Sequence, residues 1–94
     1  MSEDNTKIII TVVGNDKVGI VAAVSNKLAQ MQVNIEDIKQ TIMQNNFAMI
    51  MLCDIKDMNL SFKDFKDEIM KLQQELEMEI WIQKKDLFDK MHTI

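Results

Sequence analysis

Hydrophobic residues near the N-terminus follow two different periods on either side of a short polar loop. Residues 7–13 are almost all β-branched and are apolar on both parities, which predicts a central strand buried on both faces. After the loop, apolar residues recur every three or four positions from Ile20 to Met31. This spacing predicts an amphipathic helix of about three turns.

The middle of the chain has the pattern of two strands joined by a turn. Residues 33–43 alternate, but their apolar phase slips by one residue near Glu36 and Asp37, so we predict a β-bulge there. Residues 44–46 are polar and contain two asparagines, which tolerate left-handed backbone. Because the apolar run 47–53 follows at once, we predict a hairpin whose second strand is buried on both faces.

A second helix and a fourth strand follow. The Ser61 hydroxyl is placed to accept a hydrogen bond from the Asp64 amide, which predicts a capped helix over about 62–77. The apolar stripe of this helix is Phe62, Phe65, Ile69, Leu72 and Leu76. Residues 79–84 predict a short strand, and the tail 86–94 predicts a helical turn or short helix. The apolar face of the tail carries Leu87, Phe88, Met91 and Ile94.

The order β-α-β-β-α-β with a short C-terminal helical tail predicts an α+β fold, the ferredoxin-like βαββαβ sandwich. In this fold two helices cover one face of a four-stranded antiparallel sheet. The apolar residues on the other face need a cover, because a monomer rarely exposes such a patch. We expect the tail 87–94 to pack on the domain 7–86 or on a dimer partner. We also expect a second copy to pair through sheet faces or edges, and we predict a homodimer.

The composition is that of one small globular domain of 94 residues, 47% hydrophobic and 28% charged. The net charge is −4 and all 11 basic residues are lysines, which argues against direct binding to nucleic acid. One cysteine without a partner favours a reducing, cytoplasmic location. We expect residues 1–6 to be a flexible N-terminus rather than a signal peptide, and no apolar run reaches membrane-spanning length.

Both glycines of the chain, Gly14 and Gly19, flank the loop between the first strand and the first helix. Their spacing is that of a phosphate-binding Walker loop, but the two residues after Gly19 are apolar where that loop needs a lysine and a hydroxyl. The helix N-terminus still offers backbone N–H groups to a carboxylate, and Asp16 would cap them or accept from an ammonium, so an amino acid fits. Alternatively, Asn15 and Asp16 only make a tight connection. We expect Gly14 to turn the first strand out of the sheet.

No group of residues predicts catalysis or a metal centre. Cys53 lies inside an apolar strand and is expected in the core, while His92, the only histidine, is expected to pack or to lie on the surface. The acidic residues of the second helix alternate with lysines as on a solvated face. Trp81 is expected either to pack or to lie at a dimer edge. The methionines expected to fill gaps in or beside the core are Met43, Met49, Met51, Met70 and Met78. We therefore predict no enzyme activity and no cofactor.

The element order and the string VGNDKVGIV (residues 13–21), followed by Leu28 and by VNI (residues 33–35), resemble the ACT domain family over residues 7–86. That family has a strand, a loop of the type D-x-x-G-apolar, a helix, and a second strand that opens with N-I. Residues 37–43 and the tail 86–94 resemble more narrowly the small, uncharacterised stand-alone ACT proteins of prokaryotes, which are related to glycine cleavage system transcriptional repressors. Gln32 stands at the helix-to-strand junction, where members often have glycine.

The resemblance implies a regulatory module that associates through its sheets and binds a small effector, commonly an amino acid, at a subunit interface. It implies an effector loop that two residues of the same or a neighbouring subunit complete. The implied ligand-binding residues are Gly14, Asn15, Asp16, Lys17, Val18, Gly19, Asn34 and Ile35. A regulated protein in amino-acid metabolism is the further expected partner. The alternatives are a ligand-free dimeric interaction module and a transcription-regulation accessory protein that does not bind DNA directly.

Overall fold

The computed structural model describes residues 6–15 and 18–91, with the backbone alone at Met43 and Met91. Its elements are β1 (Lys7–Asn15), α1 (Ile20–Gln30), β2 (Asn34–Met43), β3 (Asn46–Asp54), α2 (Phe62–Leu76), β4 (Glu79–Lys84) and α3 (Lys85–Met91). The six elements of the predicted sandwich begin and end within two residues of their predicted bounds. The short C-terminal helix is also confirmed.

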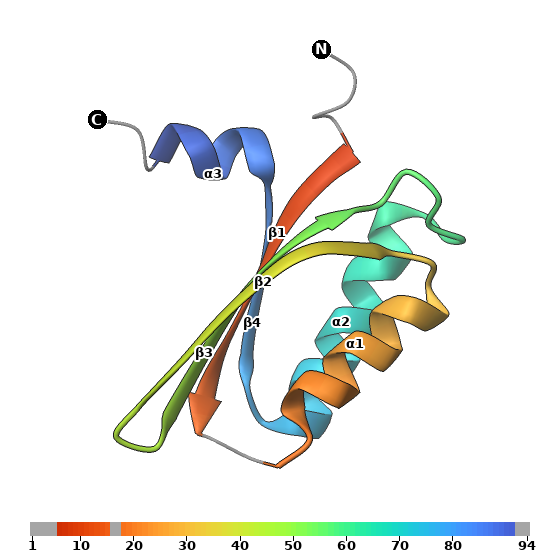
Figure 1. Ribbon diagram of the computed structural model, residues 1–94. Coiled ribbons are helices and arrows are strands. Elements are labelled where there is room, and N and C mark those ends of the chain that lie inside the picture. The colour runs from red at the N-terminus through yellow and green to blue at the C-terminus, as the bar shows by residue number, and fades with distance from the viewer. Residues whose placement is uncertain (1–5, 16–17, 92–94) are drawn as a thin grey trace.

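The four strands form one antiparallel sheet in the order β2-β3-β1-β4 (Figure 1). Helices α1 and α2 lie together on one side of the sheet, and α3 lies on the other side. Helix α1 contacts β2 and helix α2 contacts β4, so each helix covers one half of the same face. The predicted ferredoxin-like arrangement is confirmed.

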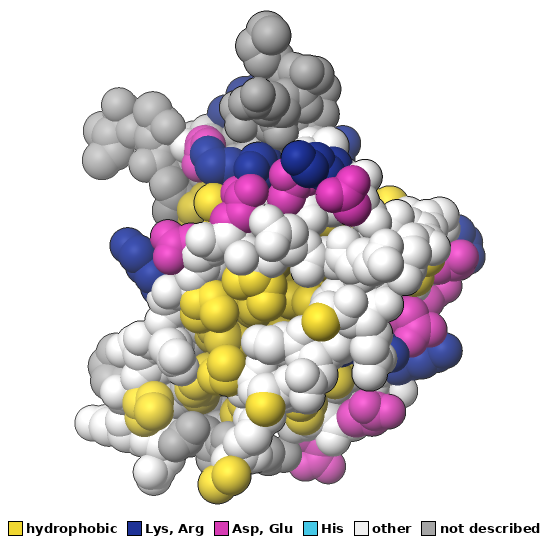
Figure 2. Space-filling view, turned by 45° about the vertical axis from the view of Figure 1, so that its right-hand side comes forward, with side chains coloured by type: hydrophobic (Ala, Val, Ile, Leu, Met, Phe, Trp, Pro, Cys, Tyr) yellow, Lys and Arg dark blue, Asp and Glu magenta, His cyan; other side chains and the backbone are white. Residues whose placement is uncertain are grey.

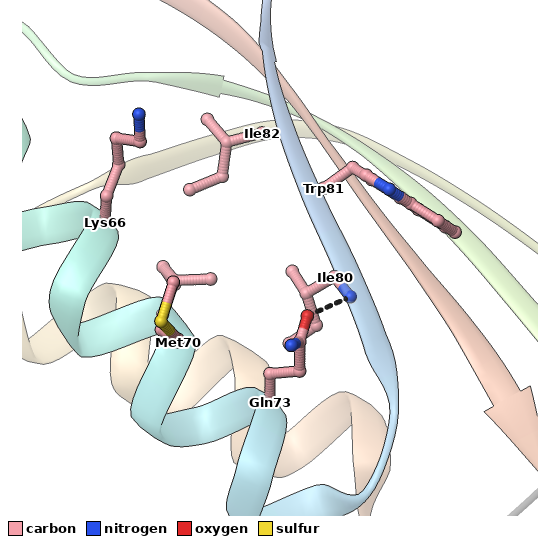
Figure 3. Close-up of a pocket in the computed structure, with 7 residues that line it drawn as sticks. Lys66, Met70, Gln73, Ile80, Trp81 and Ile82 are labelled. Carbon is pink, nitrogen blue, oxygen red and sulfur yellow. Dashed lines mark hydrogen bonds between the residues drawn. The ribbon is translucent and has the colours of Figure 1, made fainter.

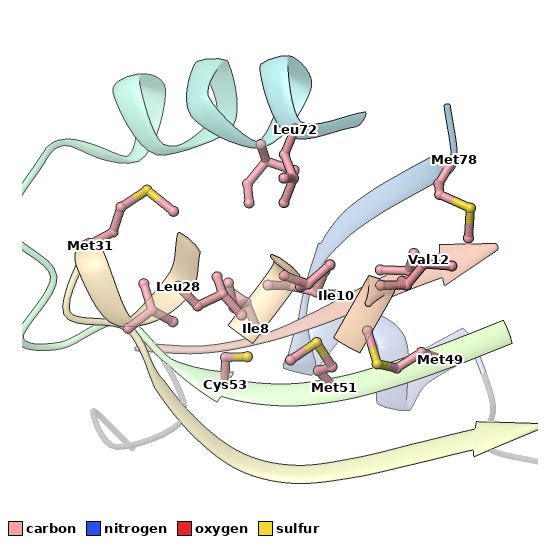
Figure 4. Close-up of a cluster of buried hydrophobic side chains, with 14 of the residues drawn as sticks. Ile8, Ile10, Val12, Leu28, Met31, Met49, Met51, Cys53, Leu72 and Met78 are labelled. Carbon is pink, nitrogen blue, oxygen red and sulfur yellow. The ribbon is translucent and has the colours of Figure 1, made fainter. Parts of the chain in front are cut away.

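Alternate residues of β1 and β3 point to the helices and fill the core (Figure 4). The register places Ile10 opposite Met51 and Val12 opposite Met49, and all four side chains are fully buried. Complete burial of a side chain of this size contributes about 1.5–3 kcal/mol. The prediction that methionines fill core gaps is confirmed for Met49, Met51 and Met78, but it is wrong for Met70, which is 57% exposed and lines a hollow between α2 and β4.

Helix α2 begins as predicted. The Asp64 amide donates to the Ser61 hydroxyl at 3.1 Å, which satisfies one of the N–H groups that a helix start leaves unpaired. Phe65 lies fully inside the core, whereas Phe62, the first position of the predicted stripe, is 37% exposed. The ring of Phe62 lies 5.9 Å from that of Phe65, with the Lys66 ammonium 5.7 Å from its centroid. Phe62 therefore marks the rim of the core.

The hairpin and the bulge are also confirmed. Gln44 and Asn45 form a two-residue loop with φ of 52° and 72°, the two positive values that a type I′ turn needs. On β2 the register shifts between Ile35 and Asp37, so Glu36 is the extra residue. The bulge absorbs the slip in hydrophobic phase, as the alternation predicted.

The helix-free face of the sheet is only partly covered. Helix α3 contacts β1 and β4, and on that face Ile9 is buried. Farther along the face Ile50 is 41% exposed and Trp81 is 53% exposed. The prediction that the third strand is buried on both faces is therefore wrong, because α3 covers only the end at which it leaves β4. Trp81 does not pack in the core.

Candidate functional site

Gly14 does not turn β1 out of the sheet. The strand continues past it, since Gly14 lies opposite Phe47 and Asn15 lies opposite Asn46. A Cβ atom at Gly14 would lie 2.5 Å from the Sδ atom of Met78, closer than real contacts allow. The expectation about Gly14 is thus wrong, and the glycine leaves room for the Met78 side chain, which packs over the strand at this point.

Gly19 is the N-cap of α1 and has a φ of 86°, a left-handed conformation that favours glycine. A Cβ atom there would meet nothing within 4 Å, so conformation and not space requires the glycine. Val18, directly before it, is fully exposed. The predicted roles of Asp16 and Lys17 fall on residues that the structure does not describe.

The other predicted site residues lie at the opposite end of the sheet. Asn34 is exposed and lies opposite Asp54, whereas Asn15 lies opposite Asn46. These two positions of β3 are eight residues apart, which at about 3.3 Å per residue separates them by roughly 26 Å. One chain therefore does not bring the loop 14–19 and Asn34 together. Ile35 shares the end of Asn34 and packs against the core.

A charged cluster lies at the end where β2 begins. The Lys7 ammonium is 2.6 Å from a carboxylate oxygen of Glu36, the bulged residue, and 3.5 Å from the Asp54 carboxylate. The Asp54 carboxylate also accepts the Lys56 amide at 3.0 Å. These residues border a hollow of about 170 Å³ that Thr6 helps to line. We call Lys7, Glu36 and Asp54 the β2-start cluster.

The β2-start cluster shifts the acidity of its members in opposite directions. The hydrogen bond to Glu36 raises the pKa of Lys7. Burial by itself would raise the pKa of Asp54, but hydrogen bonds from the Thr6 side chain and the Lys56 amide, together with the Lys7 charge, lower it. Each shift favours the charged form, so the cluster acts as an ion-pair network that joins the ends of β1, β2 and β3.

Sequence reasoning missed the β2-start cluster. The slip in hydrophobic phase pointed to Glu36, but Lys7 lies 29 residues before it in the chain. Only the strand order, which places β3 between β1 and β2, reveals that these residues meet. Cys53 lies beside the cluster and is fully buried; desolvation first, and then the Glu36 charge, raise its pKa to about 12. Its thiol therefore stays protonated and packs as a core group, as predicted.

The loop end of the molecule exposes large apolar side chains. Ile42 lies one residue from the hairpin turn, opposite Phe47, and is 60% exposed. Val18 is exposed at the same end, where Asn15 and Asn46 pair. Figure 2 shows yellow apolar atoms in the middle of the face in view, with charged side chains along its upper and right-hand margins. Among the described residues, no helix is long and apolar enough to cross a membrane.

Comparisons with known proteins identify relatives that match nearly the whole chain. A family model described as ACT domain matches residues 6–83. A UPF0237 protein of Listeria innocua is 45% identical over 86 residues, which are 92% of this chain and 97% of the relative. A UPF0237 protein of Methanocaldococcus jannaschii is 44% identical over 89 residues, with 95% of this chain and 99% of the relative covered.

Solved structures agree with these matches. An ACT domain protein from Streptococcus pneumoniae is 39% identical, with a TM-score of 0.75 over 94% of this chain and 96% of its own. A putative glycine cleavage system transcriptional repressor has a TM-score of 0.73 over 81% of this chain and 44% of its own, but it is 16% identical and shows the fold alone.

Proposed function

The chain belongs to the ACT domain family, and from that premise we propose that it is a non-catalytic regulatory protein whose homodimer binds an amino-acid effector. We further propose that the effector lies between the loop 14–19 of one subunit and Asn34 and Ile35 of the other. The observation that carries this proposal is the separation of these two groups at opposite ends of one sheet. A site made of both groups needs two chains.

The open edge of β2 offers the contact that such a dimer needs. In antiparallel ladders hydrogen-bonded pairs alternate with pairs whose backbone groups point outward. Met43 and Asn46 close the type I′ turn as a hydrogen-bonded pair, so the outward groups of β2 belong to Ile38, Gln40 and Ile42. The Ile38 amide donates to its neighbour Asp37 at 2.9 Å, so the outward amides open to a partner are those of Gln40 and Ile42. An edge of ten residues with such open groups is a template for pairing with another chain.

The opposite edge of the sheet is shorter and partly closed. Strand β4 has six residues, and the outward amide of Ile80 donates to the Gln73 side chain of α2 at 2.8 Å (Figure 3). In the same view the Trp81 side chain points away from the groove between α2 and β4. Of the two edges, β2 is therefore the better candidate for an interface.

Symmetry then brings the two halves of the site together. If two β2 strands pair antiparallel about a two-fold axis, the start of one strand lies beside the end of the other. Asn34 of one subunit would then lie at the loop end of its partner, near Val18 and Ile42. Their exposure supports this arrangement, because a partner would cover both.

The polarity of the loop suggests the class of effector. Gly19 has no side chain with which to cap α1, so the first backbone N–H groups of the helix suit a carboxylate. Asp16 supplies a carboxylate for an ammonium group in this proposal. We place the protein in the cytoplasm, where binding of the effector alters its contact with a regulated partner in amino-acid metabolism.

A thermal-shift screen over the twenty amino acids tests the proposal, since a ligand that binds only the folded state raises the melting temperature. A shift with one amino acid or a small group of them is expected. If no amino acid raises the melting temperature, the ligand-free interaction module becomes the better interpretation.

Mixed dimers test whether the site is shared. Asp16→Ala and Asn34→Ala should each weaken binding of the amino acid found in the screen. In a mixed dimer of the two variants, one site contains both changes and the other contains neither. Calorimetry should then recover wild-type affinity at half the number of sites. If each subunit held its own complete site, no intact site would appear, and the proposed dimer would be wrong.

A further inference from the structure

A hollow on the helix-free face, away from the loop 14–19, is larger than three other hollows of the molecule. Its volume is about 330 Å³, which falls at the lower end of the range for small-molecule pockets, whereas the other hollows measure about 130–170 Å³. The residues that line it are Ile9, Asp37, Lys39, Ile50, Leu52 and Phe88. We call this hollow the face pocket.

The register explains how the face pocket is built. Ile9, Leu52 and Asp37 form one row across β1, β3 and β2, and Ile50 lies beside Lys39 in the next row. All five side chains share the helix-free face, because each alternates along its strand with residues that point to the helices. Phe88 of α3 adds an aromatic wall. The floor and the wall are therefore apolar, and the charges lie on the β2 side.

The two charged residues of the face pocket differ in what they already bind. The Asp37 carboxylate accepts the amide of Ile38 at 2.9 Å, next to the bulge. Lys39 has no ion pair or hydrogen bond from its ammonium within the part of the chain that the structure describes. The pocket thus combines an apolar floor with the Asp37 carboxylate and with one cation, Lys39, that forms no ion pair within the described chain.

We propose that the face pocket binds a small carboxylate with an apolar body, such as a branched aliphatic or an aromatic acid. The carboxylate pairs with Lys39, and the apolar body covers Ile9, Ile50 and Leu52. A second hollow of about 130 Å³ shares Lys39 and Ile50 and continues along β2 and β3 to Thr41 and Ala48. Longer acyl chains therefore have room to extend toward the hairpin.

Nuclear magnetic resonance titration with 4-methylpentanoate tests the proposal. Resonances of the pocket residues should shift with saturation at millimolar concentration, and Lys39→Gln should weaken binding about three- to tenfold, because it removes a partly solvated ion pair. Ile50→Asp should abolish binding while leaving the core intact, since Ile50 is partly exposed. Lys63→Gln, on the solvated face of α2, is the matched control and should change nothing.

Two further ligands identify the recognised chemistry. The uncharged analogue 4-methylpentan-1-ol should bind to the wild type more weakly than 4-methylpentanoate does. Its affinity for Lys39→Gln should equal its affinity for the wild type. Leucine carries the same apolar body with an added ammonium, and tighter binding of leucine than of the acid would assign Asp37 to that group. Binding should persist in Asp16→Ala and Asn34→Ala, which separates this pocket from the proposed effector site.

Three results would overturn the proposal. The wild type could show no saturable shift, or Lys39→Gln and Ile50→Asp could both bind 4-methylpentanoate as tightly as the wild type does. Sedimentation could also show that Ile50→Asp loses the dimer. The last result would show that a second copy of the chain covers this face.

Discussion

The two ends of the sheet are held in different ways. At the loop end, Met78 packs over Gly14, α1 starts from a left-handed Gly19, and apolar side chains remain exposed. At the other end, the β2-start cluster joins three strands through charge. The first end depends on space and backbone conformation, the second on electrostatics. Their stabilities should therefore respond differently to pH and salt.

This difference bears on function because the proposed site takes one part from each end. A strand end and a helix start set by steric fit and backbone conformation should not respond to pH. A start of β2 set by ion pairs loosens when a carboxylate is protonated. Variants that change one end at a time can test whether the two ends are held as the structure indicates.

The largest expected effect is at Gly14. Gly14→Ala should destabilise the fold by about 1–3 kcal/mol, because the new methyl group forces Met78 out of its position. Urea denaturation at pH 7 and pH 4 should give the same loss, since no charge is involved. In a Met78→Ala background the loss should shrink. A loss that persists there would place the strain in the backbone of β1 instead.

Asp54→Asn is expected to have the second largest effect, about 1–2 kcal/mol at neutral pH, because it weakens a buried, charge-assisted set of hydrogen bonds. The folded-state pKa of Asp54 is lowered, so its contribution is present above its unfolded pKa of roughly 3.9 and is lost as pH falls further. The difference between wild type and variant should therefore close in acid, in contrast to Gly14→Ala.

Asp67→Asn provides the matched control for that experiment. Its carboxylate lies 3.7 Å from the Lys63 ammonium in an exposed pair on α2. Exposed pairs contribute little, so the free energy of unfolding should change by less than about 0.5 kcal/mol both at neutral pH and in acid. A pH-independent loss in Asp54→Asn would show that packing, and not charge, holds the start of β2.

Local sequence patterns predicted most of the fold. Runs of apolar residues on both parities located β1 and β3, and alternation located β2. The phase slip located the bulge at Glu36, and Ser61 located the start of α2. They failed where the cause is a distant residue. Gly14 is a glycine because Met78, 64 residues later, packs on it, and no local pattern contains that information.

The site was harder to predict than the fold for the same reason. The loop and Asn34 were selected together by resemblance to a family, but only the register shows that one chain holds them at opposite ends. The face pocket was not predicted at all. It depends on where α3 places Phe88 relative to the sheet, and that position follows from packing between elements rather than from the pattern within one.

Gly19→Ala should destabilise the protein by about 1 kcal/mol, because alanine at a φ of 86° is strained even though its methyl group meets nothing. Unlike Gly14→Ala, this loss should not depend on Met78. Denaturation of the double variant Gly19→Ala, Met78→Ala should give the sum of the two single losses. Coupling between the two sites would show that the loop and the strand end act as one packed unit.

The smallest expected effect concerns backbone strain at the end of the sheet where the β2-start cluster lies. Gln32 has a φ of 59° where α1 ends, and its amide and that of Val33 donate to Ala29 and Leu28, each at 3.0 Å. This is the Schellman arrangement, which favours glycine at the left-handed position. Gln32→Gly should stabilise the fold by about 0.5–1 kcal/mol, since relief of strain exceeds the added entropy of the unfolded chain.

Gln30→Gly, in the last turn of α1, is the control for Gln32→Gly and should destabilise the fold, because it has no strain to relieve. Thermal denaturation of both variants measures the contrast. A gain at Gln32 that is unchanged in Asp54→Asn would show that the turn and the β2-start cluster act independently. A gain that depends on Asp54 would mean that the ion pairs hold the turn in its strained conformation, and the start of β2 would then combine charge with strain.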